Sequence, residues 1–412
     1  MNSENDNSTD RRTFLKTASA AGAGLLIIKP ESVFGTQANS AVAFGIIGCG
    51  GRGSAVATEF VKSTDARVVA LADLFDDRLN ATKDRFDKMA EDKGQAKISS
   101  SQIFRGSRAY EKLVGSPVDA VIISSPPYFH PDHFEAAVAA GKHVYLEKPV
   151  ATDLHGCKRI QKAGERAQGK VTAHVGFQIR YAPPVREWVQ KVQDGAIGDI
   201  VCAQSYYYSG DLARKAKPGM SPLETRIRNW VFDRALSGDI IVEQNIHIID
   251  VANWVLKSHP LRAMGTGGRK ARMDVGDVWD HYVTTLYYPN DVQVSFNSTQ
   301  FSKGWGSNGL RLFGTKGTAE WHYSGGARIV GENKWDAGVN NTIEKGLSEK
   351  AKAFVEGVRG GKLENQIAQG AESTCSTILV RTAAYAGKEK AWDKVVKDHT
   401  RWEVKLNLDS LV

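Results

Sequence analysis

Short apolar runs alternate with longer amphipathic stretches over the first part of the chain, from residue 42 to about residue 150. Four of these runs predict strands, and the stretches between them predict helices. Strands and helices that alternate at this spacing form a parallel, doubly wound α/β sheet, whose ligands bind beyond the carboxyl ends of the strands. The predicted strands are Val42–Ile47, Arg67–Ala72, Asp119–Ser124 and Lys142–Leu146.

The pattern changes near Lys170, after which short strands alternate with turns through about Val330. From Leu347 onward the apolar residues return to helical spacing. Within the strand-rich part, Ser209–Arg228 has few apolar residues, which predicts a lid or a substrate loop. A chain of this length is too long for one ordinary core and suits two domains. We expect a signal region at 1–40, a first domain at 41–168 and a second domain at 169–412.

A glycine-rich loop, Gly48–Gly53, follows the first predicted strand and opens the first predicted helix. Its spacing is that of a dinucleotide-binding fingerprint. Gly48 permits the tight turn, Gly50 lets the backbone approach a pyrophosphate, and Gly53 lets the helix pack closely on the strand. The helix N-terminus then faces the phosphates. The loop therefore predicts a bound nicotinamide dinucleotide.

The second predicted strand ends at Asp73, where an acid would accept a hydrogen bond from the ribose 2′-hydroxyl and repel a 2′-phosphate. This position favours NAD over NADP. Arg78 is near in sequence and brings a positive charge, so NADP stays possible. The alternative interpretation of Asp73 is a helix cap for the segment that begins near Asp76.

Two turns, Ser124–Pro126 and Glu147–Pro149, follow predicted strands, so we expect both to line one cleft. A lysine at the closed end of such a cleft, here Lys148, can bond or relay the proton of a substrate hydroxyl. A surface lysine before a proline turn is the alternative. The sequence indicates no partner for His130, so a purely structural role is the alternative for this residue. The residues assigned to cofactor contact are Gly48, Gly50, Gly51, Arg52, Gly53, Asp73, Ser125, Pro126, His130, Glu147 and Lys148.

A second cluster of chemically useful residues lies in the segment Gly238–Trp254. On one continuous helix, Glu243, His247 and Asp250 share a face. A neutral histidine beside a carboxylate is the usual arrangement for taking a hydroxyl proton while hydride leaves the same carbon. We expect Asp250 to be the partner of the far ring nitrogen of His247. A core histidine satisfied by a buried acid is the alternative.

These motifs resemble those of the glucose-fructose oxidoreductase and inositol dehydrogenase family. The resemblance implies an α/β N-terminal Rossmann domain and an α+β C-terminal domain with a large, mostly antiparallel open sheet. That sheet often serves as an oligomer interface, so we expect a homo-oligomer. The resemblance extends over essentially the whole mature chain, and its motifs are the glycine loop, Ser124–His130, Ala140–Ala151, Gly176–Tyr181, Gly195–Ile200, Ser237–Trp254 and Leu312–Gly317.

The resemblance also implies roles for single residues. Lys148 matches the lysine that reaches both the nicotinamide and the reacting hydroxyl, and His247 matches the catalytic histidine. Glu243 stands where the family most often has aspartate, a difference that bears on the substrate. The expected catalytic residues are therefore Lys148, His247, Glu243 and Asp250. Residues that face the cleft in relatives, or that could bond or stack on a sugar, are Gln178, Arg180, Tyr181, Arg228 and Trp230.

A twin-arginine motif, Arg11–Lys16, precedes Thr17–Ile28, a mildly apolar segment rich in small residues. This segment is too short and too weakly apolar to span a membrane. The pattern indicates export by the twin-arginine machinery, with a periplasmic location in a bacterium. An ordinary N-terminal helix beside an arginine pair is the alternative. Because this route moves folded proteins, the dinucleotide can cross inside its site, and we expect it to be tightly bound.

The formal net charge of +8 belongs to the mature part, since residues 1–40 contribute four positive and four negative charges. A basic balance of this size can attract an anionic ligand. No run of lysine and arginine marks a nucleic-acid-binding face, so we expect no nucleic-acid partner. The four cysteines are far apart and show no metal-binding spacing, so we expect no metal site.

Two enzymatic hypotheses follow. The first is an NAD(P)-dependent oxidoreductase acting on a sugar or cyclitol hydroxyl, in which a trapped cofactor is restored by a second substrate. The alternative is a glycoside hydrolase or lyase that oxidises its sugar transiently and then returns the hydride. A sugar-binding sensor without chemistry would need Lys148 or His247 to be replaced, and both are present.

Overall fold

A computed structural model of the chain describes residues 41–323, 325–338 and 342–412. The predicted twin-arginine motif lies outside these described residues. Within them, no helix combines the length and the apolar character that crossing a membrane requires. The folded unit begins at Val42.

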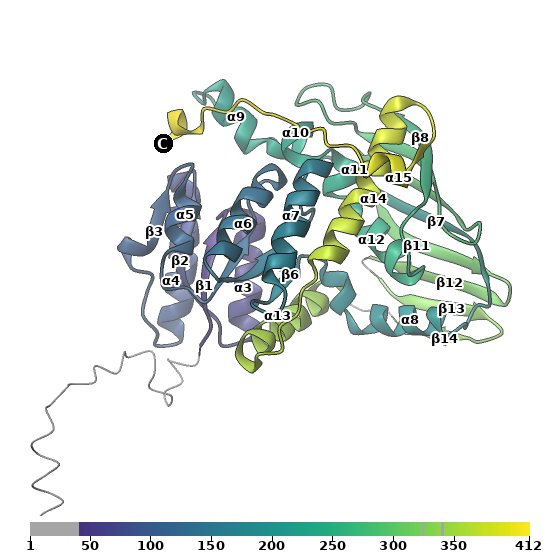
Figure 1. Cartoon of the computed structure of the whole chain (residues 1–412), viewed down its shortest axis with the longest axis horizontal. Coiled ribbons are helices and arrows are strands. Elements are labelled where there is room, and N and C mark those ends of the chain that lie inside the picture. The colour runs from purple at the N-terminus through teal and green to yellow at the C-terminus, as the bar shows by residue number, and fades with distance from the viewer. Residues whose placement is uncertain (1–40, 324, 339–341) are drawn as a thin grey trace, which may run out of the picture. The chain divides into compact units, whose positions relative to one another are not determined.

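The first sheet has six strands in the order β3-β2-β1-β4-β5-β6, and all neighbouring strands are parallel (Figure 1). The order runs outward in both directions from the middle, so a crevice opens between the carboxyl ends of β1 and β4. The strands are β1 (Ala43–Ile47), β2 (Arg67–Asp73), β3 (Ile103–Arg105), β4 (Ala120–Ile123), β5 (His143–Leu146) and β6 (Ala173–Val175). The helices between them are α3 (Gly51–Ser63), α4 (Asp76–Asp92), α5 (Ala109–Val114), α6 (His130–Ala139) and α7 (Leu154–Ala167).

The doubly wound sheet predicted from the sequence is thereby confirmed. Its last strand, β6, lies beyond the domain boundary expected at residue 168. The chain adds this strand to the sheet before it enters the second domain, because β6 pairs with β5 through Val144, Tyr145 and Leu146.

The second sheet has nine strands in the order β14-β13-β12-β11-β7-β10-β9-β8-β15. All its pairings are antiparallel except that of β10 with β7, so the expected large, mostly antiparallel sheet is confirmed. The strands are β7 (Ile200–Ser209), β8 (Arg262–Gly268), β9 (His281–Tyr287), β10 (Gln293–Gln300), β11 (Ser307–Gly314), β12 (Gly317–His322), β13 (Ala327–Gly331), β14 (Trp335–Asp336) and β15 (Lys390–Ala391).

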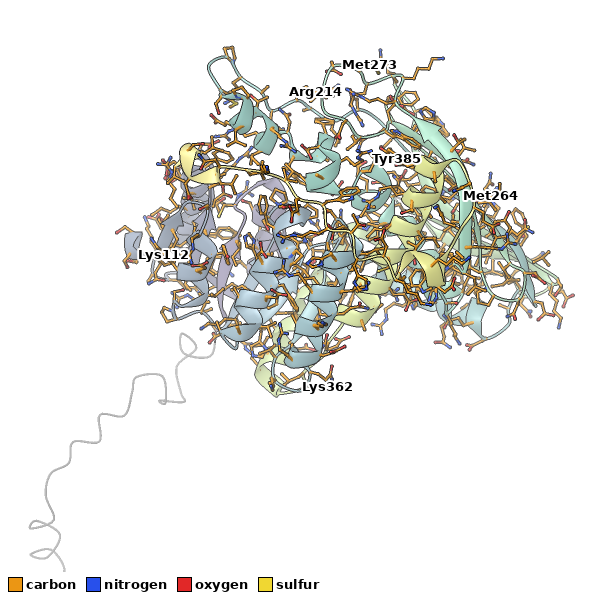
Figure 2. The ribbon with its side chains drawn as sticks, turned by 45° about the horizontal axis from the view of Figure 1, so that its top comes forward. Lys112, Arg214, Met264, Met273, Lys362 and Tyr385 are labelled. Carbon is orange, nitrogen blue, oxygen red and sulfur yellow. The ribbon has the colours of Figure 1, made fainter. Side chains whose placement is uncertain are left out.

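One face of this sheet is covered and the other carries exposed apolar side chains. Met264, Val283 and Phe313 are 44%, 55% and 37% exposed, and Figure 2 shows Met264 at the outside of the molecule. Helices cover the other face. The helical elements of this part are α8 (Pro183–Gln193), α9 (Pro222–Arg228), α10 (Arg234–Ser237), α11 (Ile240–Glu243), α12 (Ile246–Val255) and α15 (Trp392–Val395).

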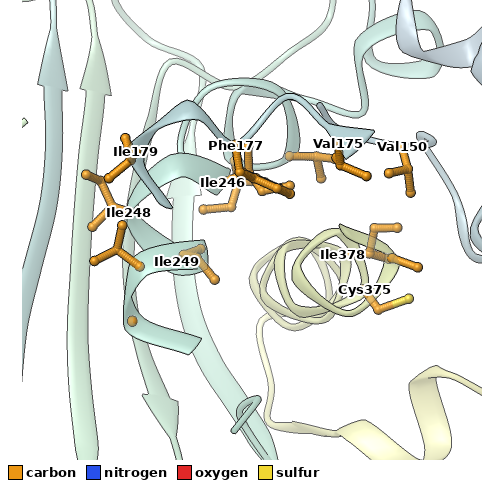
Figure 3. Packing of buried hydrophobic residues seen from close by; sticks show 14 of the residues in the cluster. Val150, Val175, Phe177, Ile179, Ile246, Ile248, Ile249, Cys375 and Ile378 are labelled. Atoms are coloured by element: carbon orange, nitrogen blue, oxygen red, sulfur yellow. The ribbon is translucent and has the colours of Figure 1, made fainter. Parts of the chain in front are cut away.

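Two long helices near the end of the chain return to the first domain. In α13 (Thr342–Gly360), the ring of Phe354 lies 5.7 Å from those of Phe44 and Phe60 beneath the parallel sheet. In Figure 3, α14 (Ile367–Ala386) is seen nearly end-on, with Ile378 toward Val150. The core cluster that contains α14 extends through both domains, and α13 belongs to a second cluster on the parallel sheet, so the domains are not consecutive in the sequence.

Candidate functional site

A groove of about 330 Å³ lies at the carboxyl ends of β1, β2 and β4. We call it the glycine-loop groove, because the loop between β1 and α3 forms one of its walls. This is where a doubly wound sheet binds its ligands. Of the residues assigned to cofactor contact, those that line the groove are Gly48, Gly50, Gly51, Asp73, Ser125 and Pro126.

The glycines of the loop serve two different purposes. Gly48 has φ of 92°, and a Cβ on Gly53 would lie 2.1 Å from the carbonyl oxygen of Gly48, so the fold itself requires both. Around Gly50 and Gly51 an added Cβ would meet no atom within 4 Å. Their missing side chains leave open space beside the groove, through which a ligand can approach the backbone.

Asp73 ends β2 at the edge of the groove. Its Oδ2 accepts a hydrogen bond from the backbone N–H of Cys49 at 2.7 Å, and its Oδ1 accepts one from that of Phe75 at 2.9 Å. Burial raises the pKa of this carboxyl. Helix α4 has no side-chain cap, so the alternative role of Asp73 as its cap is not what the structure shows.

His130 and His133 lie near the start of α6 and do different things. The Nδ1 and Nε2 of His130 each lie 2.8 Å from a backbone carbonyl oxygen, those of Pro149 and Ser125. The ring ties the two turns together outside the groove, which corrects the assignment of His130 to cofactor contact. His133 does line the groove, and its Nδ1 lies 2.9 Å from Ser125 Oγ. Burial lowers the pKa of His133 to about 3, so its ring is neutral.

The side chain of Arg52 connects the glycine loop to Glu147 and Gln178. Its Nε donates to Glu147 Oε1 at 2.8 Å, and another guanidinium nitrogen donates to Gln178 Oε1, also at 2.8 Å. The amide of Gln178 in turn donates to the hydroxyl of Tyr323 at 3.3 Å. Glu147 and Gln178 are buried. Arg52, Glu147 and Gln178 thus form a fixed polar floor between the loop and the second domain.

Lys148 and Glu243 meet across the two domains. The Nζ of Lys148 lies 2.9 Å from Glu243 Oε1 and donates to the backbone carbonyl of Glu243 at 2.6 Å. The two side chains are only 9% and 13% exposed. Since Glu243 ends α11, the short break before α12 turns its carbonyl toward the lysine. The pair places an ammonium group and a carboxylate together at the closed end.

His247 lies on α12 behind this pair. Its ring is buried, 5.6 Å from that of Tyr323 and 6.5 Å from that of Phe177. Burial, followed by the charges of Lys148 and Arg52, holds its pKa well below the usual range. Among the described residues, Nδ1 is buried without a hydrogen-bond partner. The ring is therefore a neutral base, and Nε2 is the nitrogen that a ligand can reach.

The expected partnership between Asp250 and His247 is not formed. Arg180 donates to both carboxylate oxygens of Asp250, at 2.8 and 3.0 Å, and Ser373 Oγ donates at 2.7 Å. A helix break also separates Glu243 from the other two residues, because α11 ends at Glu243 and α12 begins at Ile246. The single helix face predicted from their spacing is therefore wrong.

Two residues expected at the substrate lie away from the groove. Arg180 is held by Asp250 and lies over the ring of Trp254, beside a separate cavity. The hydroxyl of Tyr181 bonds Glu364 and Gln366. Both residues lie in the short 3-10 turn Gln178–Tyr181 that follows β6. Their assignment to substrate binding is thereby corrected, and Gln178 alone of this segment joins the cleft floor.

The other two expected substrate residues, Arg228 and Trp230, line the glycine-loop groove at its Asp73 end. Arg228 bonds both oxygens of Asp77, at 2.8 and 3.0 Å, and lies 3.9 Å over the ring of Phe75. The segment Ser209–Arg228 also brings Lys215 and Ile227 to this wall. This segment covers the dinucleotide end rather than the substrate end, contrary to a substrate role for Arg228 and Trp230.

Several side chains at the groove or near Glu243 were not identified from the sequence. His133 had a signal, since it stands one helical turn after His130 and beside the predicted cleft. Tyr207 lies in β7, and burial, followed by the nearby Tyr323 and Glu243, raises its pKa. No local pattern distinguishes Phe75, Tyr110 or Leu408. The further lining residues are Ile47, Ala72, Leu74, Phe75, Arg78, Gly106, Ser107, Ala109, Tyr110, Ser124, Phe129 and Leu408.

The residues present fit a dinucleotide. The loop leaves its backbone open at Gly50 and Gly51, helix α3 begins at Gly51, and Asp73 lies where a ribose would be met. Ser125 and His133 add polar groups along the path toward Lys148. The groove can therefore hold the dinucleotide, and Ser125 and His133 would lie along its wall.

Comparisons with known families agree with this arrangement. Residues 42–177 match the model of the oxidoreductase family with an NAD-binding Rossmann fold, and residues 185–320 match the GFO/IDH/MocA C-terminal domain. The two matches follow one another along the chain and correspond to the two sheets. The first domain is thus an NAD-binding Rossmann fold.

Curated relatives and solved structures point the same way. The chain is 30% identical to inositol 2-dehydrogenase of Acidothermus cellulolyticus over 49% of this chain and 54% of that protein. It is 30% identical to a glycosyl hydrolase family 109 protein of Solibacter usitatus over 39% of this chain and 37% of that protein. The chain spans about half the length of the curated relatives it matches. The solved aldose-aldose oxidoreductase of Caulobacter crescentus shares the fold, with a TM-score of 0.69 and 20% identity over 85% of this chain and 99% of that one.

Proposed function

The chain belongs to the GFO/IDH/MocA family of oxidoreductases, and from this premise we propose that it transfers hydride between NAD and a hydroxyl-bearing carbon of a sugar or cyclitol. The observation that carries the proposal is the buried ion pair of Lys148 and Glu243 together with the neutral, buried His247, whose pKa the charges of Lys148 and Arg52 lower in addition to burial. The named activities of inositol 2-dehydrogenase and aldose-aldose oxidoreductase support this substrate class.

The protein's own groups supply the proton chemistry. NAD, when bound, accepts or returns the hydride. Nε2 of the neutral His247 accepts the proton of the substrate hydroxyl as that oxygen becomes a carbonyl. The ammonium group of Lys148 donates a hydrogen bond to the same oxygen and stabilises the charge that develops on it. Glu243 holds this ammonium in place through its carboxylate and its backbone carbonyl.

The charges near the closed end favour a neutral substrate. Arg52 is paired with Glu147, and Lys148 is paired with Glu243. Each of these two cations therefore already has a carboxylate partner. The anionic group of a sugar acid or a sugar phosphate would have to displace one of these carboxylates from its cation. Breaking a buried ion pair costs about 3–5 kcal/mol. We infer an uncharged polyol.

A second candidate is a glycoside hydrolase that oxidises its sugar transiently. The match to a glycosyl hydrolase family 109 protein is the observation in its favour. Oxidation beside an acidic ring C–H would let a base remove that proton and expel the aglycone, after which hydride is returned. The same NAD site and the same His247 and Lys148 would serve both reactions.

Three further points belong to this proposal. The Arg11–Lys16 motif supports export by the twin-arginine route and a periplasmic location. Export with NAD inside would require tight retention of the cofactor. The exposed apolar residues Met264, Val283 and Phe313 on the open sheet support a homo-oligomer formed through that face.

Mass spectrometry of the full-length protein, as purified and then denatured, tests the cofactor. NAD is expected, and NADP would contradict the role given to Asp73. Free inositols, free aldoses and nitrophenyl glycosides then test the reaction, with reduced nicotinamide and released nitrophenol followed together. Stable reduction by a free polyol supports the oxidoreductase. Nitrophenol release without net reduction would move the assignment to the hydrolase.

Two variants test the residues. Lys148→Met and His247→Asn are each expected to lower turnover about 10²- to 10⁴-fold, the usual contribution of a positioned acid or base, while bound NAD stays near the wild-type amount. Lys362→Met removes an exposed lysine far from the groove and serves as the matched control (Figure 2). Unchanged turnover in both variants would refute the mechanism.

A further inference from the structure

The last segment of the described chain runs across the first domain as a strap that is extended through Asn407 and ends in a 3-10 turn, Leu408–Leu411. After α15, residues 399–412 leave the second domain and pass beside α9 at the top of Figure 1. Along the strap, exposed and partly buried residues alternate. An extended chain places successive side chains on opposite sides, so one row faces the protein. The inward row consists of Trp402, Val404, Leu406 and Leu408.

Trp402 anchors the near end of the strap. Its indole ring lies 3.9 Å from the guanidinium of Arg381 and 5.8 Å from that of Arg234. Its backbone N–H donates to Asp153 Oδ2 at 2.7 Å. Arg381 is itself buried and bonds the backbone carbonyls of Thr152 and Gly238. This end is therefore fixed at a junction between the two domains.

The far end is seated on the edge of the parallel sheet. Leu408 lines the glycine-loop groove together with Ser107 and Tyr110. The hydroxyl of Ser107 donates to the carboxylate of Asp409, and Arg105 donates to the carbonyl of Leu411 at 3.4 Å. The strap thus closes the groove on the side of β3, next to the position of Asp73.

The opposite bank of the same part of the groove is formed by the second domain. Ile227 and Arg228 line it, and Arg228 is bonded to Asp77 and stacked on Phe75. Leu408 and Ile227 offer apolar side chains from the two banks, which suits the flat, apolar faces of an adenine ring. The groove is therefore bounded at its Asp73 end by two segments that lie far apart in the sequence.

We propose that the strap is a clasp on the adenosine half of the cofactor, with Leu408 as a cofactor-contacting residue, and that NAD leaves only when this strap lifts. The inference rests on the proposed function, since it places NAD in the glycine-loop groove. It provides a physical basis for retention, because release then requires breaking the contacts of Leu408 and Asp409 in addition to those of the dinucleotide itself.

The test is the rate at which bound NADH leaves the full-length protein. The protein is loaded with NADH and mixed with excess lactate dehydrogenase and pyruvate, which oxidise only free NADH, and the loss of NADH fluorescence is followed. Leu408→Asp places a charge at the inward position, and a stop codon after Glu403 removes the far end while keeping Trp402. Asn407→Asp places the same charge on the neighbouring, outward side chain and serves as the control.

Release is expected to be at least about tenfold faster in Leu408→Asp and in the truncated protein, and unchanged in Asn407→Asp. Thermal unfolding checks that each variant is folded. If the truncated protein does not fold, Leu408→Asp still tests the proposal. Wild-type release rates in folded Leu408→Asp protein would overturn the clasp and leave the proposed function intact. Failure of the wild-type protein to bind NADH would overturn both.

Discussion

Replacing single glycines of the glycine loop separates the needs of the fold from those of the cofactor. Gly50→Ala adds a Cβ where no atom lies within 4 Å, at a residue whose φ of −73° alanine adopts readily. Glycine is somewhat better than alanine before a helix, while alanine restricts the unfolded chain, so the two effects oppose each other. We expect the free energy of unfolding without cofactor to change by less than about 1 kcal/mol.

The same Cβ would occupy the open space through which the dinucleotide approaches the backbone. For Gly50→Ala we expect the Kd for NADH to rise about 10- to 100-fold, which corresponds to about 1.4–2.8 kcal/mol. Gly53→Ala is the contrasting change, since its Cβ would lie 2.1 Å from the carbonyl oxygen of Gly48. That overlap must move helix α3 or strand β1, so we expect a loss of about 1–3 kcal/mol of stability even without cofactor.

Urea unfolding of cofactor-free protein measures the first quantity, and fluorescence titration with NADH measures the second. The two variants should separate, because Gly50→Ala loses binding at nearly constant stability whereas Gly53→Ala loses both. Wild-type affinity in Gly50→Ala would refute the argument that the backbone there meets the pyrophosphate. Equal destabilisation by both changes would show that the open space at Gly50 is not free in solution.

Three further predictions concern buried titratable groups. Burial lowers the pKa of His130 to about 4. As the pH falls below about 6.5, this histidine takes up a proton in the unfolded chain before it does so in the folded protein, so the urea midpoint should fall between pH 6.5 and 4 and stay constant above pH 7. Asp250→Asn should cost about 3–5 kcal/mol of stability by stranding Arg180, with NADH affinity unchanged; a normal urea midpoint would contradict this. Glu243→Asp shortens the arm to Lys148 by about 1.5 Å and should lower kcat/KM about tenfold, with no change in bound NAD.

Most of the fold followed from local patterns. Four strands of the parallel sheet are apolar runs, and the glycine loop marks the turn from strand to helix, so these were predicted at nearly the right residues. The short strands β3 and β6 were not predicted. The position of α13 could not be predicted, because nothing in its own sequence indicates which surface its apolar face covers. It packs on Phe44 and Phe60, which belong to the first strand and the first helix of the first domain.

The site shows where reasoning from spacing fails. Glu243, His247 and Asp250 have helical spacing, yet the chain breaks at Gln244 and Asn245 and divides them. Asp250 then faces Arg180, a residue that the sequence analysis had assigned to the substrate. A pairwise contact between distant segments leaves no signal in either segment, so Lys148 and Glu243 could be named from their motifs but their ion pair could not be foreseen.

The two ends of the cleft differ in how firmly the second domain holds the first. At the closed end, Lys148 and Glu243 are 9% and 13% exposed, and breaking such a pair costs about 3–5 kcal/mol. At the other end, Arg228 pairs with Asp77; the side chain of Arg228 is 11% exposed but that of Asp77 is 57% exposed, so solvent screens this pair more than the buried one. Movement therefore costs least at the Asp73 end, where the strap also lies. Exchange of the cofactor would begin at its adenosine half, while the groups that handle the substrate proton stay in place.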